Sequence, residues 1–176
     1  FHYYWSKHEF SYGDRCILFK DQEVFPNKLY VYDRLQNYKK IGSLYVNDPS
    51  FTDRYVREFN NFNADFIQAY PSSLYSLAKN MKTLGIKSKP YKTIFLASEE
   101  VNIEHNDLIA EVFSPTEIVY HYGHSECAAL AFKYPNANYF GFSPIYGHIE
   151  LFYGDKKVNS YDETGEIVAT TYNKSM

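Results

Sequence analysis

The hydrophobic pattern is clearest in the middle of the chain, where short apolar runs alternate with amphipathic stretches. Three runs, too short for helices, predict buried strands: residues 65–69, 92–97 and 117–122. A helix is predicted after the first run, because apolar residues recur at helical spacing and Gly85 follows them: Leu74, Leu77, Ala78 and Met81. Asn102 caps a second predicted helix, after the second run. This alternation of strands and helices predicts crossover connections and a parallel sheet.

The flanking segments carry weaker patterns. Residues 15–19 predict a short apolar strand, and residues 52–62 predict a helix with Ser50 or Thr52 as its cap. Beyond the middle of the chain, residues 125–132 predict the start of a further helix. The remaining sequence is typical of antiparallel strands joined by turns.

These elements predict an α/β fold. A parallel crossover sheet is flanked by helices and followed by a smaller, β-rich antiparallel piece, with strands at residues 148–153 and 165–172. We expect one incomplete domain in three parts: a lead-in at residues 1–62, the parallel α/β core at 63–135 and the β-rich segment at 136–176. The sequence has no initiator Met, so we expect a fragment of a longer protein.

Composition and charge argue against two classes of partner. The formal net charge is −3 and no basic run is interleaved with aromatics, so nothing favours nucleic acid or an anionic membrane surface. The apolar runs are far too short to span a membrane, and residues 1–5 do not resemble a signal peptide. Two cysteines are too few for a disulfide framework, so we expect a reducing, cytoplasmic location.

Two loops after predicted strands carry the residue types of a ligand site. One holds Tyr122, Gly123 and Glu126, and the other holds Ser98 and Glu99. Because ligands bind at the carboxyl ends of parallel strands, we expect the two loops side by side at one edge of the sheet. The same residues also have a structural explanation, since a tyrosine packs under loops and glutamates favour helix N-termini. Spacing alone leaves both interpretations open.

Other chemistries fit the sequence less well. The segment after the third strand nearly matches the G-x-S-x-G elbow of an α/β-hydrolase, but no Asp or Glu lies between Glu126 and His148. His121, His124 and Cys127 have a spacing of three, yet no partner pair of metal ligands exists elsewhere, so polar loop residues are the favoured interpretation over zinc. The eight glycines are spread out, and none forms a Gly-rich phosphate loop.

Four short motifs resemble those of one enzyme family. They occur in this order: Tyr70-Pro71-Ser72, Ser98-Glu99, Tyr122-Gly123-x-Ser125-Glu126 and Gly165-Glu166-Ile167-Val168-Ala169-Thr170. Together they are similar to phenylacetate–CoA ligases, and more so to relatives encoded with capsular polysaccharide genes. The resemblance implies an adenylate-forming ligase whose parent activates a small carboxylate with ATP and often passes the acyl group to a thiol such as coenzyme A.

The resemblance also implies roles for the residues of the third motif. Tyr122 and Gly123 would flank the adenine, with the tyrosine ring stacked on it, and Ser125 would lie in the same nucleotide-binding loop. Glu126 would be the catalytic carboxylate that holds Mg²⁺ against the phosphates of ATP, as suits a hard oxygen ligand.

The remaining matched residues would surround the same site. Ser98 and Glu99 would lie beside the nucleotide, and Tyr70 towards the acyl pocket. Residues 133–142 lack the Cys and His that many family members carry after the third motif. The family's phosphate loop, ribose-binding Asp and catalytic Lys would belong to N- and C-terminal parts outside these 176 residues, so we expect the fragment alone to be inactive. A non-catalytic relative acting as a binding or interaction module stays open, as does an unrelated binding domain.

Overall fold

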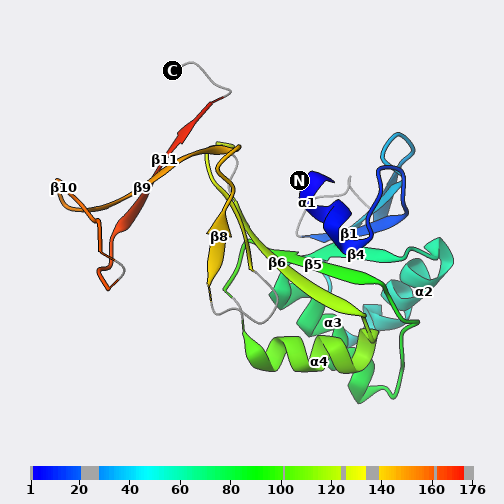
Figure 1. Ribbon diagram of the computed structural model, residues 1–176. Coiled ribbons are helices and arrows are strands. Elements are labelled where there is room, and N and C mark those ends of the chain that lie inside the picture. The colour runs from blue at the N-terminus through cyan, green and yellow to red at the C-terminus, as the bar shows by residue number, and fades with distance from the viewer. Residues whose placement is uncertain are drawn as a thin grey trace. The chain divides into compact units, whose positions relative to one another are not determined.

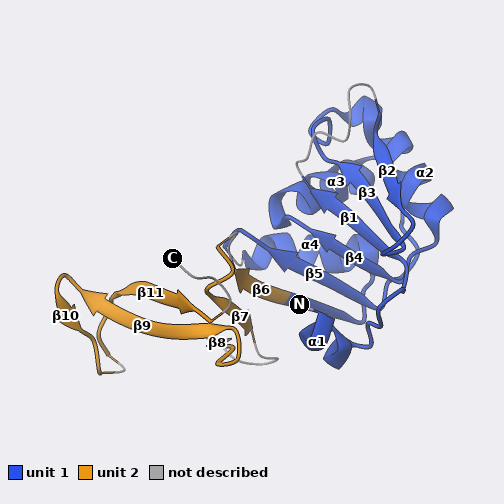
Figure 2. Ribbon diagram, turned by 90° about the horizontal axis from the view of Figure 1, so that it is seen from above, with its two compact units in different colours: residues 1–119 blue, residues 120–176 orange. Residues whose placement is uncertain are grey.

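The structure is a computed structural model that describes residues 2–20, 28–100, 102–123, 126–133, 139–160 and 162–172. The chain divides into two compact units, Phe1–Val119 and Tyr120–Met176 (Figure 2). Among the described residues, no helix has both the length and the apolar character needed to cross a membrane.

The first unit is built on a mostly parallel sheet (Figure 1). Its strands are β1 Cys16–Lys20, β2 Tyr30–Asp33, β3 Tyr38–Gly42, β4 Phe66–Ala69 and β5 Thr93–Ala97. They lie in the order β2-β3-β1-β4-β5; β2 is antiparallel to β3, and the other pairs are parallel. The predicted parallel pairing of residues 65–69 with 92–97 is confirmed, with Ile67 opposite Ile94.

The third predicted strand, β6 (Glu117–Gly123), begins beside β5 and ends in the second unit. The amides of Thr116 and Glu117 donate to the carbonyls of Tyr91 and Lys92 at 3.0 and 3.1 Å. These bonds join the amino ends of the two strands, as parallel neighbours require.

Among the described residues of the first unit, six helices accompany the strands. They are α1 His2–Trp5, η1 Ser6–His8, η2 Pro49–Phe51, α2 Thr52–Phe62, α3 Pro71–Thr83 and α4 Ile103–Phe113, where η marks a 3₁₀ helix. Gly85 follows α3 with a φ of +67°, which glycine adopts without steric cost. The predicted cap of α4 is confirmed, since the Asn102 side-chain oxygen accepts from the His105 amide at 3.2 Å.

The predicted cap of α2 is wrong. Phe51 precedes that helix and provides no side-chain capping bond. Instead, the Asp48 carboxylate accepts from the Ser50 amide at 2.9 Å and caps η2, which leads directly into α2. Asp caps helices as well as Ser does, and because Asp48 lies earlier in the chain, a 3₁₀ turn precedes the α-helix.

Both faces of the first sheet are covered. Helices α2, α3 and α4 lie on one face and α1 on the other (Figure 1). Phe19 of β1 meets Tyr55 of α2 edge to face at 5.4 Å between ring centroids, whereas Phe95 of β5 stacks on Trp5 of α1 at 4.3 Å. Strands covered on both faces need apolar residues throughout rather than in alternation, and β5 is buried at every position.

The second unit is antiparallel. After β6 it contains β7 Leu130–Lys133, β8 Phe140–Phe142, β9 Gly147–Tyr153, β10 Lys156–Lys157 and β11 Glu166–Thr171. β7 pairs with β6 and β8, and β9 pairs with β10 and β11. The antiparallel strands predicted at residues 148–153 and 165–172 are confirmed. Gly147 is required sterically, because a Cβ there would lie 2.0 Å from the Ala128 carbonyl oxygen.

The helix predicted at residues 125–132 is wrong. The described part of this segment forms a bend at residues 126–128 and then strand β7. Cys127 has a φ of +57°, which a right-handed helix does not accommodate. The backbone of β6 gains a partner in β7, with Tyr122 opposite Ala131, and this pairing outweighs the helix preference of Ala and Leu.

Candidate functional site

The carboxyl ends of the parallel strands in the first unit lie at one edge of the sheet. Tyr70 directly follows β4 and Ser98 directly follows β5, so the structure brings these two predicted residues to the same edge. Lys20 ends β1, the strand on the other side of β4. Its carbonyl accepts from the Ser43 amide at 3.1 Å. Parallel α/β sheets bind ligands at this edge.

Glu99 joins the loop after β5 to the start of α3. Its carboxylate accepts from the Ser72 amide at 2.7 Å and from the Ser72 hydroxyl at 2.6 Å. Tyr70 occupies the N-cap of α3 without a side-chain capping bond, so Glu99 supplies the missing acceptor from another segment. The first two sequence motifs therefore meet through Glu99 and Ser72.

Ser98 has an unusual backbone conformation beside this contact. Its φ is +72°, in the left-handed region that residues other than glycine adopt at a cost. Such conformations persist where the surrounding contacts fix them, and they cluster at ligand sites. The Glu99 contact with Ser72 is the neighbouring restraint that the structure provides.

Lys20 adds a cation to this edge. Its ammonium nitrogen lies 5.8 Å from the centroid of the Tyr70 ring, and burial lowers the pKa of Lys20. A partly buried ammonium on an aromatic face suits an anionic ligand group. Sequence reasoning missed Lys20, because the strand at residues 15–19 was not assigned to the parallel sheet. That assignment would have placed the following lysine at the ligand edge.

The second unit holds the residues of the third motif. Tyr122 and Gly123 end β6, and Tyr122 is 41% exposed, with an edge contact between its ring and that of Phe142 at 6.0 Å between centroids. His121 is buried, because successive residues of a strand face opposite sides. The sequence expectation that Tyr122 lies beside Ser98 stays a prediction.

Glu126 lies in the exposed bend before β7. Ser125 falls outside the described residues, as does His124 of the spacing considered for zinc. Among the described residues no group of three or more His, Cys, Asp and Glu side chains could hold a metal. Mg²⁺ bound with phosphates needs only one or two carboxylates, so an exposed Glu126 fits that ion. An exposed Tyr122 ring equally fits stacking on a base.

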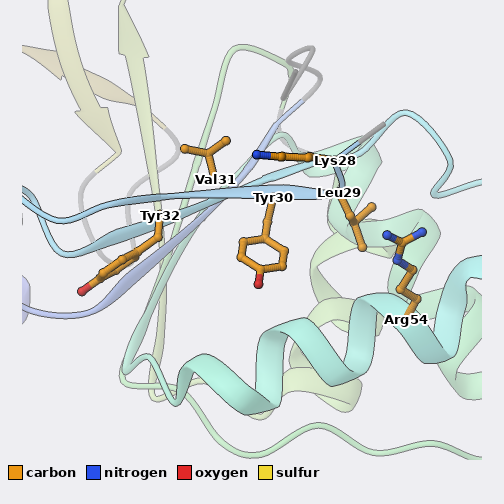
Figure 3. Close-up of a pocket in the computed structure, with 6 residues that line it drawn as sticks. All are labelled: Lys28, Leu29, Tyr30, Val31, Tyr32 and Arg54. Carbon is orange, nitrogen blue, oxygen red and sulfur yellow. The ribbon is translucent and has the colours of Figure 1, made fainter. Parts of the chain in front are cut away.

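A groove of about 450 Å³ lies elsewhere in the first unit (Figure 3). It follows edge strand β2 beside α2, and its lining residues are Lys28, Leu29, Tyr30, Val31, Tyr32 and Arg54. None of the residues predicted from the motifs lines it. We therefore place the candidate site of the first unit at the carboxyl ends of its parallel strands, where Tyr70 and Ser98 lie.

Solved structures share this architecture. 2-Hydroxyisobutyryl-CoA ligase, crystallised in an open conformation with 2-HIB-AMP and CoA, matches 93% of this chain with a TM-score of 0.63 and 16% identity. CmiS6 matches 97% with a TM-score of 0.59 and 12% identity, and VinN matches 89% with a TM-score of 0.56 and 14% identity. The chain therefore shares its fold with part of the 2-hydroxyisobutyryl-CoA ligase structure.

These likenesses cover only part of the solved proteins. The chain spans 37% of the 2-hydroxyisobutyryl-CoA ligase chain, 43% of CmiS6 and 40% of VinN. No family model matches the sequence, and no curated protein matches it. At this level of identity the likeness establishes the fold, and activity is a separate question.

Proposed function

We propose that this chain is part of an adenylate-forming ligase that activates a small carboxylate with ATP. The observation that carries the proposal is the fold shared with 2-hydroxyisobutyryl-CoA ligase over 93% of the chain. In this reaction a carboxylate oxygen attacks the α-phosphorus of ATP, and the bond to pyrophosphate breaks. The acyl group then passes to a thiol, for which we propose coenzyme A, and AMP leaves.

The proposed roles follow the motifs. Tyr122 stacks on the adenine, while Gly123 lets the nucleotide approach the backbone and Ser125 belongs to the same loop. Glu126 holds Mg²⁺, which when bound neutralises charge on the phosphates. The exposure of Tyr122 and Glu126 supports these assignments.

Residues of the first unit have proposed roles towards both the acyl group and the nucleotide. Tyr70 lies towards the acyl pocket, and Ser98 and Glu99 lie beside the nucleotide. Their position at the carboxyl ends of β4 and β5 supports this part of the proposal. Lys20, next to Tyr70, is available for an anionic group of the substrate.

We also propose a narrower family and a location. The four motifs favour the phenylacetate–CoA ligase branch, among relatives encoded with capsular polysaccharide genes. The sequence contains only two cysteines, too few for a disulfide framework, which supports a reducing, cytoplasmic location.

ATP–pyrophosphate exchange tests the proposal. We expect the protein encoded by the complete reading frame to catalyse exchange with at least one member of a panel of small carboxylates, and to form the corresponding acyl-AMP. ATP binding without exchange across the panel would instead favour a non-catalytic binding module. The 176 residues alone should give no exchange above background, because they contain no Gly-rich phosphate loop.

A further inference from the structure

Glu99 uses both of its carboxylate oxygens in hydrogen bonds with a single residue, Ser72. One carboxylate oxygen accepts the Ser72 amide at 2.7 Å, and the other accepts the hydroxyl of the same residue at 2.6 Å. Both oxygens are thus committed to one residue 27 positions away in the sequence. Because two bonds share one partner, the contact fixes orientation as well as distance.

The contact joins the first turn of α3 to the loop that follows β5. Ser72 is in the first turn of α3, directly after Pro71 and Tyr70, and the positive end of the helix dipole favours a carboxylate there. On the other side, Glu99 follows Ser98, whose φ of +72° needs an external restraint. The Glu99 side chain therefore adds a second restraint, beyond the pairing of β4 with β5, on the position of Tyr70 relative to Ser98.

We propose that Glu99 is a positioning residue for carboxylate adenylation, acting through Ser72. By holding the start of α3 against the loop after β5, it sets the spacing between Tyr70 on the acyl side and Ser98 on the nucleotide side. This inference rests on the proposed function. It assigns Glu99 an effect on the alignment of the two substrates, because its two oxygens already bind Ser72.

If Glu99 aligns the substrates, its loss should change the rate of adenylation, whereas a purely structural Glu99 should affect only stability. A small misplacement of reacting groups lowers the rate of the chemical step, whereas loss of an exposed hydrogen bond alone changes stability slightly. We expect Glu99→Ala in the complete protein to lower kcat of adenylation by about 10-fold or more, with KM for ATP changed less than about 3-fold. Glu99→Gln should recover most of that loss, because its amide oxygen accepts from the Ser72 N–H and its NH₂ donates to the hydroxyl.

Glu111→Ala is the matched control. Its carboxylate contacts Lys82 at 2.6 Å and so bridges α4 to α3, but at the carboxyl ends of these helices rather than near the start of α3. This variant should keep kcat while losing a comparable surface contact. The double variant Glu99→Ala with Ser72→Ala should be no slower than Glu99→Ala, since both changes remove the same contact.

Four outcomes decide the inference. A lower kcat in Glu99→Ala, recovered in Glu99→Gln and absent in Glu111→Ala, supports it. Equal losses in Glu99→Ala and Glu99→Gln would show that the charge acts on a ligand directly and overturn positioning. An active wild type with a fully active Glu99→Ala would overturn this inference alone. A wild type without pyrophosphate exchange would overturn the proposed function, and this inference with it.

Discussion

The candidate residues of the two units follow different kinds of strand: parallel strands in the first unit and an antiparallel pair in the second. In the first unit, Tyr70 and Ser98 follow strands that are covered on both faces, and Glu99 connects the loop after β5 to the start of α3. In the second unit, Tyr122 lies near the end of a strand with an antiparallel partner, and the residue is 41% exposed. A doubly covered parallel sheet fixes its loops by packing, whereas an antiparallel strand fixes them by pairing. Substitutions should therefore have different consequences in the two units.

The largest effect on stability is expected when a buried side chain in the core of the first unit is replaced by alanine. Phe95 is fully buried and stacks on Trp5, so Phe95→Ala should lower the free energy of unfolding by about 3–5 kcal/mol. Ile167 in the second unit is 43% exposed, and Ile167→Ala should lower it by less than about 1 kcal/mol. Denaturant unfolding of both variants measures the difference. Equal losses would contradict the contrast between the units.

The second effect concerns catalysis by the complete protein. If Glu126 holds Mg²⁺, Glu126→Gln removes the charge that binds the metal while keeping the size of the side chain. We expect adenylation to fall by roughly 10²-fold, a barrier change of about 3 kcal/mol, measured by pyrophosphate exchange. Stability should change little, because Glu126 is exposed and precedes a strand rather than a helix.

A purely structural Glu126 predicts the reverse pattern. The helix-dipole explanation open to the sequence does not apply, since residues 130–133 form β7. An active Glu126→Gln enzyme with a lower melting temperature would show that the proposed metal-binding role is wrong. Melting temperature and exchange activity should therefore be measured on the same preparation.

Sequence reasoning reached the parts of the fold that local patterns determine. The apolar run at residues 92–97 predicted β5, because a strand covered on both faces must be apolar throughout. The run at residues 15–19 was identified as a strand, but its place between β3 and β4 depends on pairings distant in sequence. The helix predicted at residues 125–132 was wrong because Ala and Leu favour helices locally, whereas the backbone pairing of β7 with β6 outweighs that preference.

The residues of the candidate site also fall into those that local sequence patterns predict and those that depend on contacts distant in sequence. Tyr70 and Ser98 were predictable, because both follow strands joined by a crossover helix and such strands end at one edge. The bond from Ser72 to Glu99 was not predictable, since it depends on side-chain directions across 27 residues. Lys20 was overlooked for a related reason, because its place beside Tyr70 needs the β1–β4 pairing.

The third effect tests close packing in the second unit. Gly147→Ala would place a Cβ 2.0 Å from the Ala128 carbonyl oxygen and 2.8 Å from that of Thr170. Backbone atoms yield less easily than side chains, so we expect a loss of about 1–3 kcal/mol in unfolding free energy. Gly154→Ala is a useful comparison, since nothing lies within 4 Å of the added atom and only its φ of +57° opposes the change. A Gly147→Ala variant as stable as wild type would mean that β9 and the bend before β7 are less closely packed.

The smallest effect is a pH dependence that belongs to the first unit. Tyr91 is buried next to β5, and burial raises its pKa from 10.0 to about 12. The folded state therefore binds the phenolic proton more tightly than the unfolded chain does. The resulting stabilisation is complete below pH 10 and is lost as the pH rises through about 12.

Chemical unfolding at a series of alkaline pH values measures this term. Between pH 9 and pH 11 it should remove about 1 kcal/mol of stability from the wild type. Tyr91→Phe cannot ionise at this position, so its stability should fall by about that much less over the same interval. Parallel curves for Tyr91→Phe and the wild type would mean that Tyr91 ionises as readily in the folded protein as in the unfolded chain, and that the packing of the first unit does not protect it.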